Sequence, residues 1–595
     1  MSPSEQKINE VGRHAQENAN LIWNAANSLF GAFKPHEYGL VILPMCVIKR
    51  FHDCLLPTRD AVLEANKQYA SFGELKVGFL REAAGYQFYN PSQFTFARLI
   101  TDPENIEDNF RDYLAGFSDN VQQILSRMNF PAQIDRMVEA GGLYQVIVDF
   151  SAENLDMSPN RISTVDMGYI FENLVQRFSE SYNEEAGAHF TSRDIIYLMC
   201  DLLLTDNPIV NDDDGIHCTV YDMTMGTSQM LTCMEERLKQ LDDKATVQTF
   251  GQEINPFTMG IAVADTMIHG GDPDNMQFGD TLSDDKFTGY QFDFVISNPP
   301  FGIDWKREAS VVEAEHKKGE NGRFAPGLPS KSDGQMLFLM NGVKKLKDTG
   351  RMAIIQNGSS LFTGDAESGQ SEIRRYLIEN DWLDAIVQLP NDSFYNTGIA
   401  TYIWIINKAK SQERKGKVQL IDASKCCQSR RKPIGNKRVD IAENSRAMIV
   451  QAYGAYQTKT YQGTEEDGKP IVCKSKILDG VSLGYRKVVV ETPVYNEDGT
   501  PVLKRGNKVP DPAKRDTENI PLTEDVQAYI SREVLPYNPD AWVDENKTKI
   551  GYEIPFTRTF YEYTPIEPSA EIAARIAKRE QSLMAKLHKL FGEKM

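Results

Sequence analysis

The stretch Phe292-Asp293-Phe294-Val295-Ile296-Ser297-Asn298-Pro299-Pro300-Phe301-Gly302 decides how the rest of the chain is interpreted. Its first six residues are mostly apolar, which is typical of a buried strand. The two prolines end that strand, because proline has no N–H to donate to a sheet ladder. The sequence therefore predicts a strand that runs into a stiff polar loop.

This loop has the chemistry to hold a planar amino group. The side-chain oxygen of Asn298 and a backbone carbonyl of the Pro299-Pro300 pair can both accept from one NH2 group, and Phe301 can stack on the attached ring. Two acceptors raise the electron density on the amino nitrogen. The competing interpretation is a strand that ends in an ordinary proline-rich turn. We take Asn298, Pro299, Pro300 and Phe301 as candidate catalytic residues.

Length and composition limit the possibilities further. A chain of 595 residues is too long for one core, so two or three domains are expected. The net charge of −19 argues against a broad basic face, so any nucleic-acid contact must lie in a basic cleft or come from a partner. The eight cysteines form no Cys-x-x-Cys pair, and no apolar run is long enough for a membrane span. We expect a reduced, cytoplasmic protein that needs neither a metal nor a membrane.

The chain is expected to fold as α/β with three parts. Residues 1–160 show apolar residues at helical spacing and predict an N-terminal helical domain. In residues 161–425, short apolar runs alternate with helix-length segments, which predicts a doubly wound, Rossmann-like parallel sheet. The expected strands are 217–221, 247–252, 292–297, 351–356, 385–389 and 401–407, the last of them a possible antiparallel addition.

Residues 426–595 are less regular and predict a mixed and helical C-terminal extension. Segment 425–438 is basic and rich in turn residues, so it either touches phosphates or is a solvated loop. Segment 495–518 indicates a hairpin or a flexible linker. Residues 568–591 predict an amphipathic helix with one narrow apolar seam, which packs on its own chain or docks on a partner helix.

Polar residues upstream of the opening stretch suggest a second half of the site. Asp222 and Gly226 lie in a turn after a strand, where glycine lets the backbone approach a ligand and the carboxylate can accept from an ammonium group. Glu253 ends the next strand, where a doubly wound fold binds ribose hydroxyls. Asp280 follows and can bond an adenine amino group or lie beside the substrate. This order fits a nucleoside cofactor that faces an amine substrate.

With these elements in place, the chain resembles the S-adenosylmethionine-dependent DNA methyltransferases that methylate adenine. Over nearly its whole length it resembles the modification subunits (HsdM) of type I restriction-modification systems. The segments that carry this resemblance are 23–26, 34–39, 41–44, 189–193, 251–256, 279–282, 298–302, 332–335, 350–355, 361–364, 389–390 and 394–399.

The resemblance implies roles for individual residues. S-adenosyl-L-methionine would be the methyl donor, and the residues around it would be Phe190 and Thr191 at the methionine end, Asp222 and Gly226 at the amino-acid portion, Glu253 on the ribose and Asp280 near the adenine. The target adenine would be flipped out of the duplex, because a stacked amino group cannot reach a buried donor. Its holders would be Asn298, Pro299 and Phe301, with Phe394 or Tyr395 as a second stacking surface.

The resemblance also implies partners. A site-specific adenine methyltransferase of this kind would act on DNA in a complex of two such subunits, one specificity subunit and a restriction subunit. The transfer would be direct, and the chain contains no Pro-Cys nucleophile of the kind that cytosine carbon methylation needs.

One motif departs from the family pattern. Family members commonly have Asp-Pro-x-x-Gly-x-Gly where this chain has Asp222-Met223-Thr224-Met225-Gly226-Thr227-Ser228. Ser228 is expected to need an ordinary backbone conformation, and the two methionines are expected to add bulk around the pocket.

Two alternatives therefore stay open. One is a scaffold subunit that keeps the fold and binds cofactor poorly. The other is a methyltransferase for a protein glutamine amide, although such enzymes are far shorter and usually have Tyr at the position of Phe301.

Overall fold

The computed structural model describes residues 19–162 without 32, 35 and 36, the single residues 167, 170 and 174, and residues 191–591 without 212–214, 396 and 564–566. The chain divides into two compact units, residues 1–554 and 555–595. None of the helices in these described ranges combines the length and the apolar character that a membrane span requires.

The N-terminal part is helical, as predicted. Its helices are α2 (Gly39–Leu55), α3 (Arg59–Gln68), α4 (Lys76–Ala84), α5 (Phe96–Leu99), α6 (Ile106–Ala115), α7 (Asp119–Arg127), α8 (Phe130–Glu139) and α9 (Leu143–Phe150). They share one continuous apolar core with the sheet domain. The junction is tight, because a Cβ on Gly260 of α13 (Pro256–Ile268) would collide with Met128, which follows α7.

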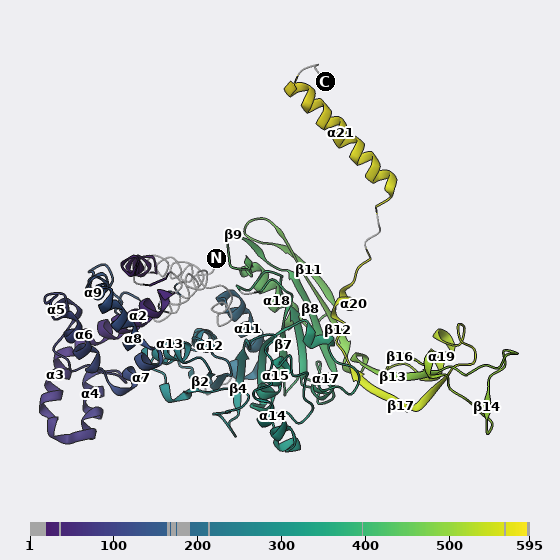
Figure 1. The fold of residues 1–595 in the computed structure, drawn as a ribbon, viewed down its shortest axis with the longest axis horizontal. Helices are drawn as coiled ribbons and strands as arrows, with labels where there is room; N and C mark the ends of the chain where they lie inside the picture. Colours follow the sequence, from purple (N-terminus) through teal and green to yellow (C-terminus); the bar gives the residue numbers. More distant parts are fainter. Residues whose placement is uncertain are drawn as a thin grey trace. The chain divides into compact units, whose positions relative to one another are not determined.

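A ten-stranded sheet forms the centre of the first unit (Figure 1). Its strand order is β11-β12-β8-β6-β7-β5-β4-β1-β2-β3. The strands are β1 (His217–Asp222), β2 (Thr246–Glu253), β3 (Met276–Phe278), β4 (Phe292–Ser297), β5 (Leu346–Asn357), β6 (Leu383–Gln388), β7 (Thr401–Asn407), β8 (Lys417–Lys425), β11 (Lys459–Thr464) and β12 (Pro470–Asp479).

The strand directions place the carboxyl ends of the central strands at one edge of the sheet. β1 pairs in parallel with both β2 and β4, and β4 pairs in parallel with β5. The chain therefore proceeds outward from β1 in one direction and from β4 in the other. In open α/β sheets, ligands bind at the carboxyl ends of the strands where this reversal occurs.

Helices cover both faces of this sheet, because right-handed crossovers in opposite directions place them on opposite sides. α12 (Gln229–Leu241) connects β1 to β2 and packs on α11 (Arg193–Leu204). α15 (Gln335–Lys344) precedes β5 and packs on α17 (Gly369–Glu379). The doubly wound fold class predicted from the sequence is confirmed.

All six predicted strands are present within a few residues of their expected bounds, and β7 is antiparallel to both its neighbours. The boundary expected at residue 425 falls inside the sheet domain, because β12 pairs with β8 and β11 pairs with β12. Helix α18 (Glu443–Ala455) packs on these added strands. The basic segment forms a hairpin of β9 (Gln428–Ile434) and β10 (Lys437–Asp440).

The rest of the first unit is a small sheet of β16 (Asp516–Pro521), β13 (Gly484–Glu491) and β17 (Trp542–Tyr552), with α19 (Val526–Glu533) packed in its own small core. Segment 495–518 contains the hairpin of β14 (Leu503–Lys504) and β15 (Asn507–Lys508), so the hairpin alternative is confirmed.

The second unit contains α20 (Phe556–Phe560) and α21 (Ser569–Phe591), which confirms the predicted C-terminal helix. Its apolar side chains Ile572, Ile576 and Leu583 are exposed.

Candidate active site

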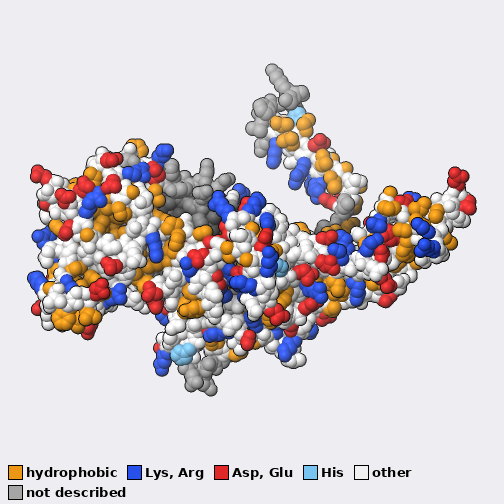
Figure 2. All heavy atoms as spheres, turned by 60° about the horizontal axis from the view of Figure 1, so that its bottom comes forward, with side chains coloured by type: hydrophobic (Ala, Val, Ile, Leu, Met, Phe, Trp, Pro, Cys, Tyr) orange, Lys and Arg blue, Asp and Glu red, His pale blue; other side chains and the backbone are white. Residues whose placement is uncertain are grey.

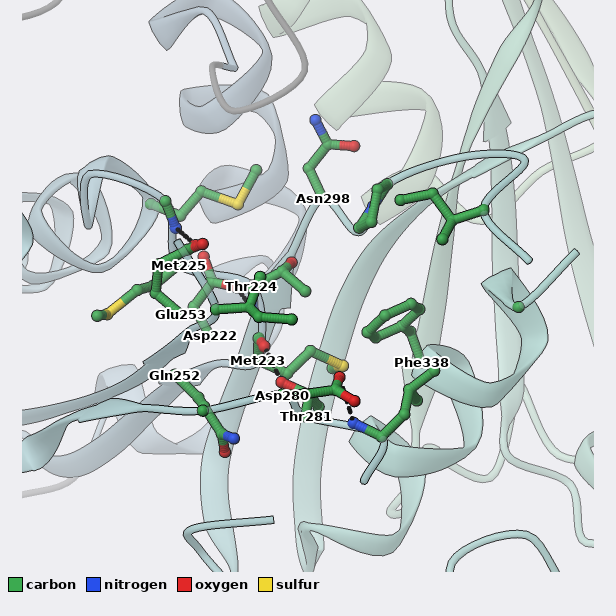
Figure 3. Close-up of a pocket in the computed structure, with 18 of the residues that line it drawn as sticks. Asp222, Met223, Thr224, Met225, Gln252, Glu253, Asp280, Thr281, Asn298 and Phe338 are labelled. Carbon is green, nitrogen blue, oxygen red and sulfur yellow. Dashed lines mark hydrogen bonds between the residues drawn. The ribbon is translucent and has the colours of Figure 1, made fainter. Parts of the chain in front are cut away.

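A cavity of about 440 Å³ opens at the carboxyl ends of β1 to β4, where the topology predicts a ligand site (Figure 3). Segments from six places in the sequence form its wall. They are Thr191 and Ile196, residues 222–227 with Gln229 and Met230, residues 252–254, residues 279–282, Asn298 with Pro300, 303–305 and Glu308, and Gly334 with Phe338.

Asp222 lies at the end of β1 with its carboxyl group buried, and the side chain is 1% exposed. Its Oδ1 accepts hydrogen bonds from the Thr224 amide at 3.0 Å and from the Ser297 hydroxyl at 2.6 Å. Its other oxygen, Oδ2, accepts no hydrogen bond from the described residues. The side chain therefore stabilises the turn with one oxygen, and its other oxygen can accept from a ligand in the cavity that the residue lines.

The pKa of Asp222 is raised from 3.8 to about 7, mainly because burial disfavours the charged carboxylate. The hydrogen bonds from Ser297 and Thr224 lower the pKa and offset part of this effect, while the negative charge of Glu253 raises it. Near neutral pH this carboxyl group is therefore partly protonated. A positively charged ligand group would favour its ionised form.

Glu253 connects β2 to the turn after β1. Its Oε2 accepts from the Gly226 amide at 2.9 Å, and its Oε1 accepts from the Asn255 amide at 2.7 Å. Asn255 in turn caps α13, accepting from the amides of Phe257 and Thr258. Each carboxylate oxygen of Glu253 can accept a further hydrogen bond, and the residue lines the cavity, as binding of neighbouring hydroxyls requires.

The expectation for Ser228 is wrong. Ser228 has a left-handed backbone with φ of +70°, in the region that favours glycine, and its side chain makes no capping hydrogen bond. The turn imposes this conformation: the Ser228 amide donates to the Met225 carbonyl at 2.7 Å, and the Thr232 amide donates to the Ser228 carbonyl at 3.1 Å. The chain therefore adopts the glycine-type turn without the second glycine.

The two methionines of this turn are accommodated by glycines on neighbouring elements. Met225 packs against Gly251, where a Cβ would collide with its side chain. The sulfur of Met223 accepts from Asn341 of α15 at 3.4 Å, and a Cβ on Gly342 would collide with its methyl group. Both side chains border the cavity while part of their bulk lies over these glycines.

Asp280 also lines the cavity, but both its oxygens stabilise the turn that follows it. Oδ1 accepts from the Leu282 amide at 3.1 Å, and Oδ2 accepts from the Ser283 amide at 3.2 Å. Arg323 holds the same turn by donating to the Thr281 carbonyl at 2.6 Å and to the Leu282 carbonyl at 3.0 Å. This part of the wall is rigid.

Asn298 stands across the cavity from Asp280 in Figure 3. Its Nδ2 donates to the Thr191 hydroxyl at 2.8 Å, which fixes the orientation of the amide. Its Oδ1 is buried and has no hydrogen-bond partner in the described part of the chain. A buried acceptor without a partner costs about 1–3 kcal/mol, so this atom is suited to accept from a bound N–H group.

The other predicted acceptor residues differ from one another. Pro300 lines the cavity, whereas Pro299 is buried and Phe301 packs against the main core. Of the two residues expected as a second stacking surface, Phe394 is only 3% exposed and belongs to the core, whereas Tyr395 is half-buried. Phe190 lies outside the described residues.

Several residues that border the cavity had no role assigned to them from the sequence. Ile254, directly after Glu253, is 60% exposed, and Phe338 of α15 points into the cavity (Figure 3). The buried Trp305 also contributes to the wall. An exposed isoleucine at a strand end is the one local signal among them. No three His, Cys, Asp or Glu side chains within the described ranges are grouped to hold a metal ion.

Two known protein families match parts of this chain. Residues 163–481 match the family N-6 DNA Methylase, and residues 18–150 match the HsdM N-terminal domain. Together these matches cover most of the chain.

Individual relatives extend the comparison. The type I restriction enzyme MjaIX methylase subunit of Methanocaldococcus jannaschii is 22% identical over 75% of this chain and 78% of its own length. The HindI methylase subunit of Haemophilus influenzae is 26% identical over 57% of this chain and 71% of its own length. The crystal structure of a type I restriction-modification methyltransferase subunit from Streptococcus thermophilus has a TM-score of 0.61 at 21% identity, and the match covers 79% of this chain and 97% of that one. This structural likeness supports the fold.

Proposed function

The chain belongs to the N-6 DNA methylase family, and we propose that it transfers a methyl group from S-adenosylmethionine to the N6 amino group of adenine in DNA. The observation that carries the proposal is the unpartnered, buried Oδ1 of Asn298 beside a cavity with two carboxylates at its strand ends. Membership of the family already makes the chain an adenine-specific DNA methyltransferase. Beyond this membership, we propose its cofactor, the roles of its site residues and its partners.

The cavity residues fit S-adenosylmethionine. Asp222 would bind the ammonium group of the methionine portion with its free oxygen, and Glu253 would accept from the ribose hydroxyls. Gly226 has φ of +56° and leaves room for close approach of the ligand to the backbone. Asp280 would lie near the adenine of the cofactor, although its turn-stabilising bonds leave it less free than the other two carboxylates. When bound, this cofactor supplies an electrophilic methyl group.

Asn298 would act on the target base. Its Oδ1 would accept from the N6 amino group of a flipped adenine, which orients the nitrogen lone pair and increases its electron density. Thr191 keeps the amide in this orientation by accepting from Nδ2. Phe301 packs on the core in this structure, so stacking of Phe301 on the adenine would require the loop after Pro300 to move.

We further propose that the chain works in a type I restriction-modification complex. The matched HsdM N-terminal domain and the exposed apolar seam of α21 support this assembly. A specificity subunit would read the DNA sequence, α21 would dock on it, a second copy of this chain would complete the methyltransferase, and a restriction subunit would join them.

Two measurements test the proposal. Calorimetry with S-adenosylmethionine should show binding by the chain purified with the subunits that stay attached to it. Labelled methyl transfer to adenine in DNA should occur in the wild type and fall by about a thousandfold or more in Asn298→Ala, since an electrostatic partner of the reacting group is removed.

The cofactor affinity of Asn298→Ala should stay within about threefold of the wild type, because Asn298 faces the acceptor rather than the donor. Retained transfer by Asn298→Ala would contradict its role. Absence of cofactor binding in the wild type would favour the scaffold alternative.

A further inference from the structure

The β9–β10 hairpin carries a concentrated positive charge that the proposed transfer chemistry does not use. Residues 425–438 contain six Lys and Arg residues and no Asp or Glu, in a chain whose net charge is −19. Lys425, Arg431, Lys432 and Arg438 are exposed. None of these four forms an ion pair with a carboxylate in the described part of the chain. They are therefore available to an external anion.

This hairpin lies at the same edge of the sheet as Asn298. β8 is parallel to β6, and both are oriented like β5 and β4 through the antiparallel β7. The hairpin follows the carboxyl end of β8 at Lys425, as Asn298 follows the carboxyl end of β4. Figure 2 shows Lys and Arg side chains (blue) gathered over the middle of the first unit, on a surface where acidic side chains (red) are also scattered.

The hairpin is fixed to the segments that surround Asn298. Lys437 is fully buried, and its Nζ donates to Asp194 Oδ2 at 3.0 Å and to the Ser393 carbonyl at 3.0 Å. Asp194 is three residues after Thr191, the partner of Asn298. Burial of such an ion pair requires good geometry, so the hairpin has one defined position rather than that of a solvated loop.

Backbone contacts strengthen this attachment. The Asn436 amide donates to the Tyr395 carbonyl at 2.9 Å, and the Arg438 amide donates to the Asp392 carbonyl at 2.8 Å. Gly435, with φ of +53°, lies so close to the Tyr395 carbonyl that a Cβ would collide with it. The loop after β6 therefore holds the backbone of the hairpin in place, while the four exposed cations of this segment face solvent.

We propose that the β9–β10 hairpin is a phosphate clamp, which binds the backbone of the DNA strand beside the flipped adenine and holds the base in register with Asn298. The inference rests on the proposed function. Phosphate contacts of this kind position a duplex without reading its sequence. They also reconcile the acidic chain with DNA binding, because the positive charge is concentrated where the strand passes the site.

The test uses the chain purified with its attached subunits and a fluorescent duplex that contains adenine. Arg431→Ala/Lys432→Ala removes two exposed cations from the clamp. The matched control, Lys504→Ala/Arg505→Ala, removes two exposed cations from the β14–β15 hairpin, which Figure 1 shows away from β9. The slope of log K against log salt should fall by about 2 in the first variant and stay unchanged in the second.

Cofactor affinity separates the possible failures. It should be unchanged in both double variants, since neither hairpin lines the cavity. Equal salt slopes for the wild type and the clamp variant would overturn the clamp, even if methyl transfer to adenine persists. An equal loss of slope in both double variants would also overturn it, because the effect would then be one of general charge. A wild type that binds no S-adenosylmethionine would overturn the proposed function itself.

Discussion

The acceptor loop after β4 (residues 298–302) and the donor turn after β1 (residues 222–228) line one cavity, yet they are built in opposite ways. The acceptor loop is stiff by composition, with two prolines, and its Asn298 Oδ1 has no hydrogen-bond partner among the described residues. The donor turn has lost the proline and one glycine of the family pattern, and hydrogen bonds from neighbouring elements hold its backbone and one oxygen of Asp222. Its shape comes from neighbours: Glu253 holds Gly226, and Ser297 holds Asp222.

This difference shows that a motif can lose residues and keep its geometry when other elements impose the conformation. The acceptor loop depends on its own residues, so single substitutions there should remove function. The donor turn depends on a network, so its substitutions should have graded effects.

Asp222→Asn should weaken cofactor binding most within the donor turn. Asparagine keeps an oxygen that can accept from Thr224 and Ser297, so the fold should be retained, but it removes the charge that pairs with an ammonium group. A buried charged hydrogen bond contributes about 2 kcal/mol, so the Kd for S-adenosylmethionine should rise about 30-fold at pH 8. Calorimetry measures it. An unchanged Kd would show that the ammonium group lies elsewhere.

The same carboxyl group predicts a pH dependence. Because the pKa of Asp222 is about 7, the free protein holds a proton there below neutral pH, and that proton must leave before the ammonium group binds. Affinity should therefore fall on acidification, by about fivefold from pH 7 to pH 6 and about tenfold for each further unit.

Affinity should also fall above about pH 8, where the α-amino group of the ligand loses its own charge. A binding series across this range, repeated with Asp222→Asn, checks the assignment. The variant should lose the acidic limb and have a shallower alkaline limb, because the carboxylate that favours the ammonium form is gone; an acidic limb that persists in the variant would assign the titration to another group.

Thr191→Val should affect the acceptor side alone. It removes the hydroxyl that accepts from Asn298 Nδ2 and keeps a similar shape, so the Asn298 amide can rotate. Loss of one neutral hydrogen bond of about 1 kcal/mol should lower kcat about fivefold with little change in cofactor affinity. Thr191→Ser, which keeps the hydroxyl, is the control. A raised Kd at unchanged kcat would instead assign Thr191 to the methionine end of the cofactor.

The sequence predicted what local chemistry determines. The prolines after β4 end the strand wherever it packs. The short apolar runs that alternate with helix-length segments predict β1, β2, β4 and β5 as strands. Contacts between distant residues were not predictable, because Lys437 and Asp194 are 243 positions apart and neither has a local signal. Phe338 reaches the cavity from a helix that is apolar almost throughout, so its sequence does not distinguish a cavity residue from a core residue.

Ser228→Gly should have the smallest effect and the opposite sign. The left-handed conformation of Ser228 costs about 1–2 kcal/mol, and its side chain makes no capping bond that would be lost. Glycine adds entropy to the unfolded chain, so the net gain in the free energy of unfolding should be about 0.5–1 kcal/mol. Denaturant titration should show this gain, with Ser228→Ala as a control that keeps the strain.

Because Glu253 and Met225 already hold the turn, the cofactor affinity of Ser228→Gly should change less than about twofold. A large gain in affinity would show that the serine distorts the pocket and that the neighbouring elements do not fully impose the family geometry.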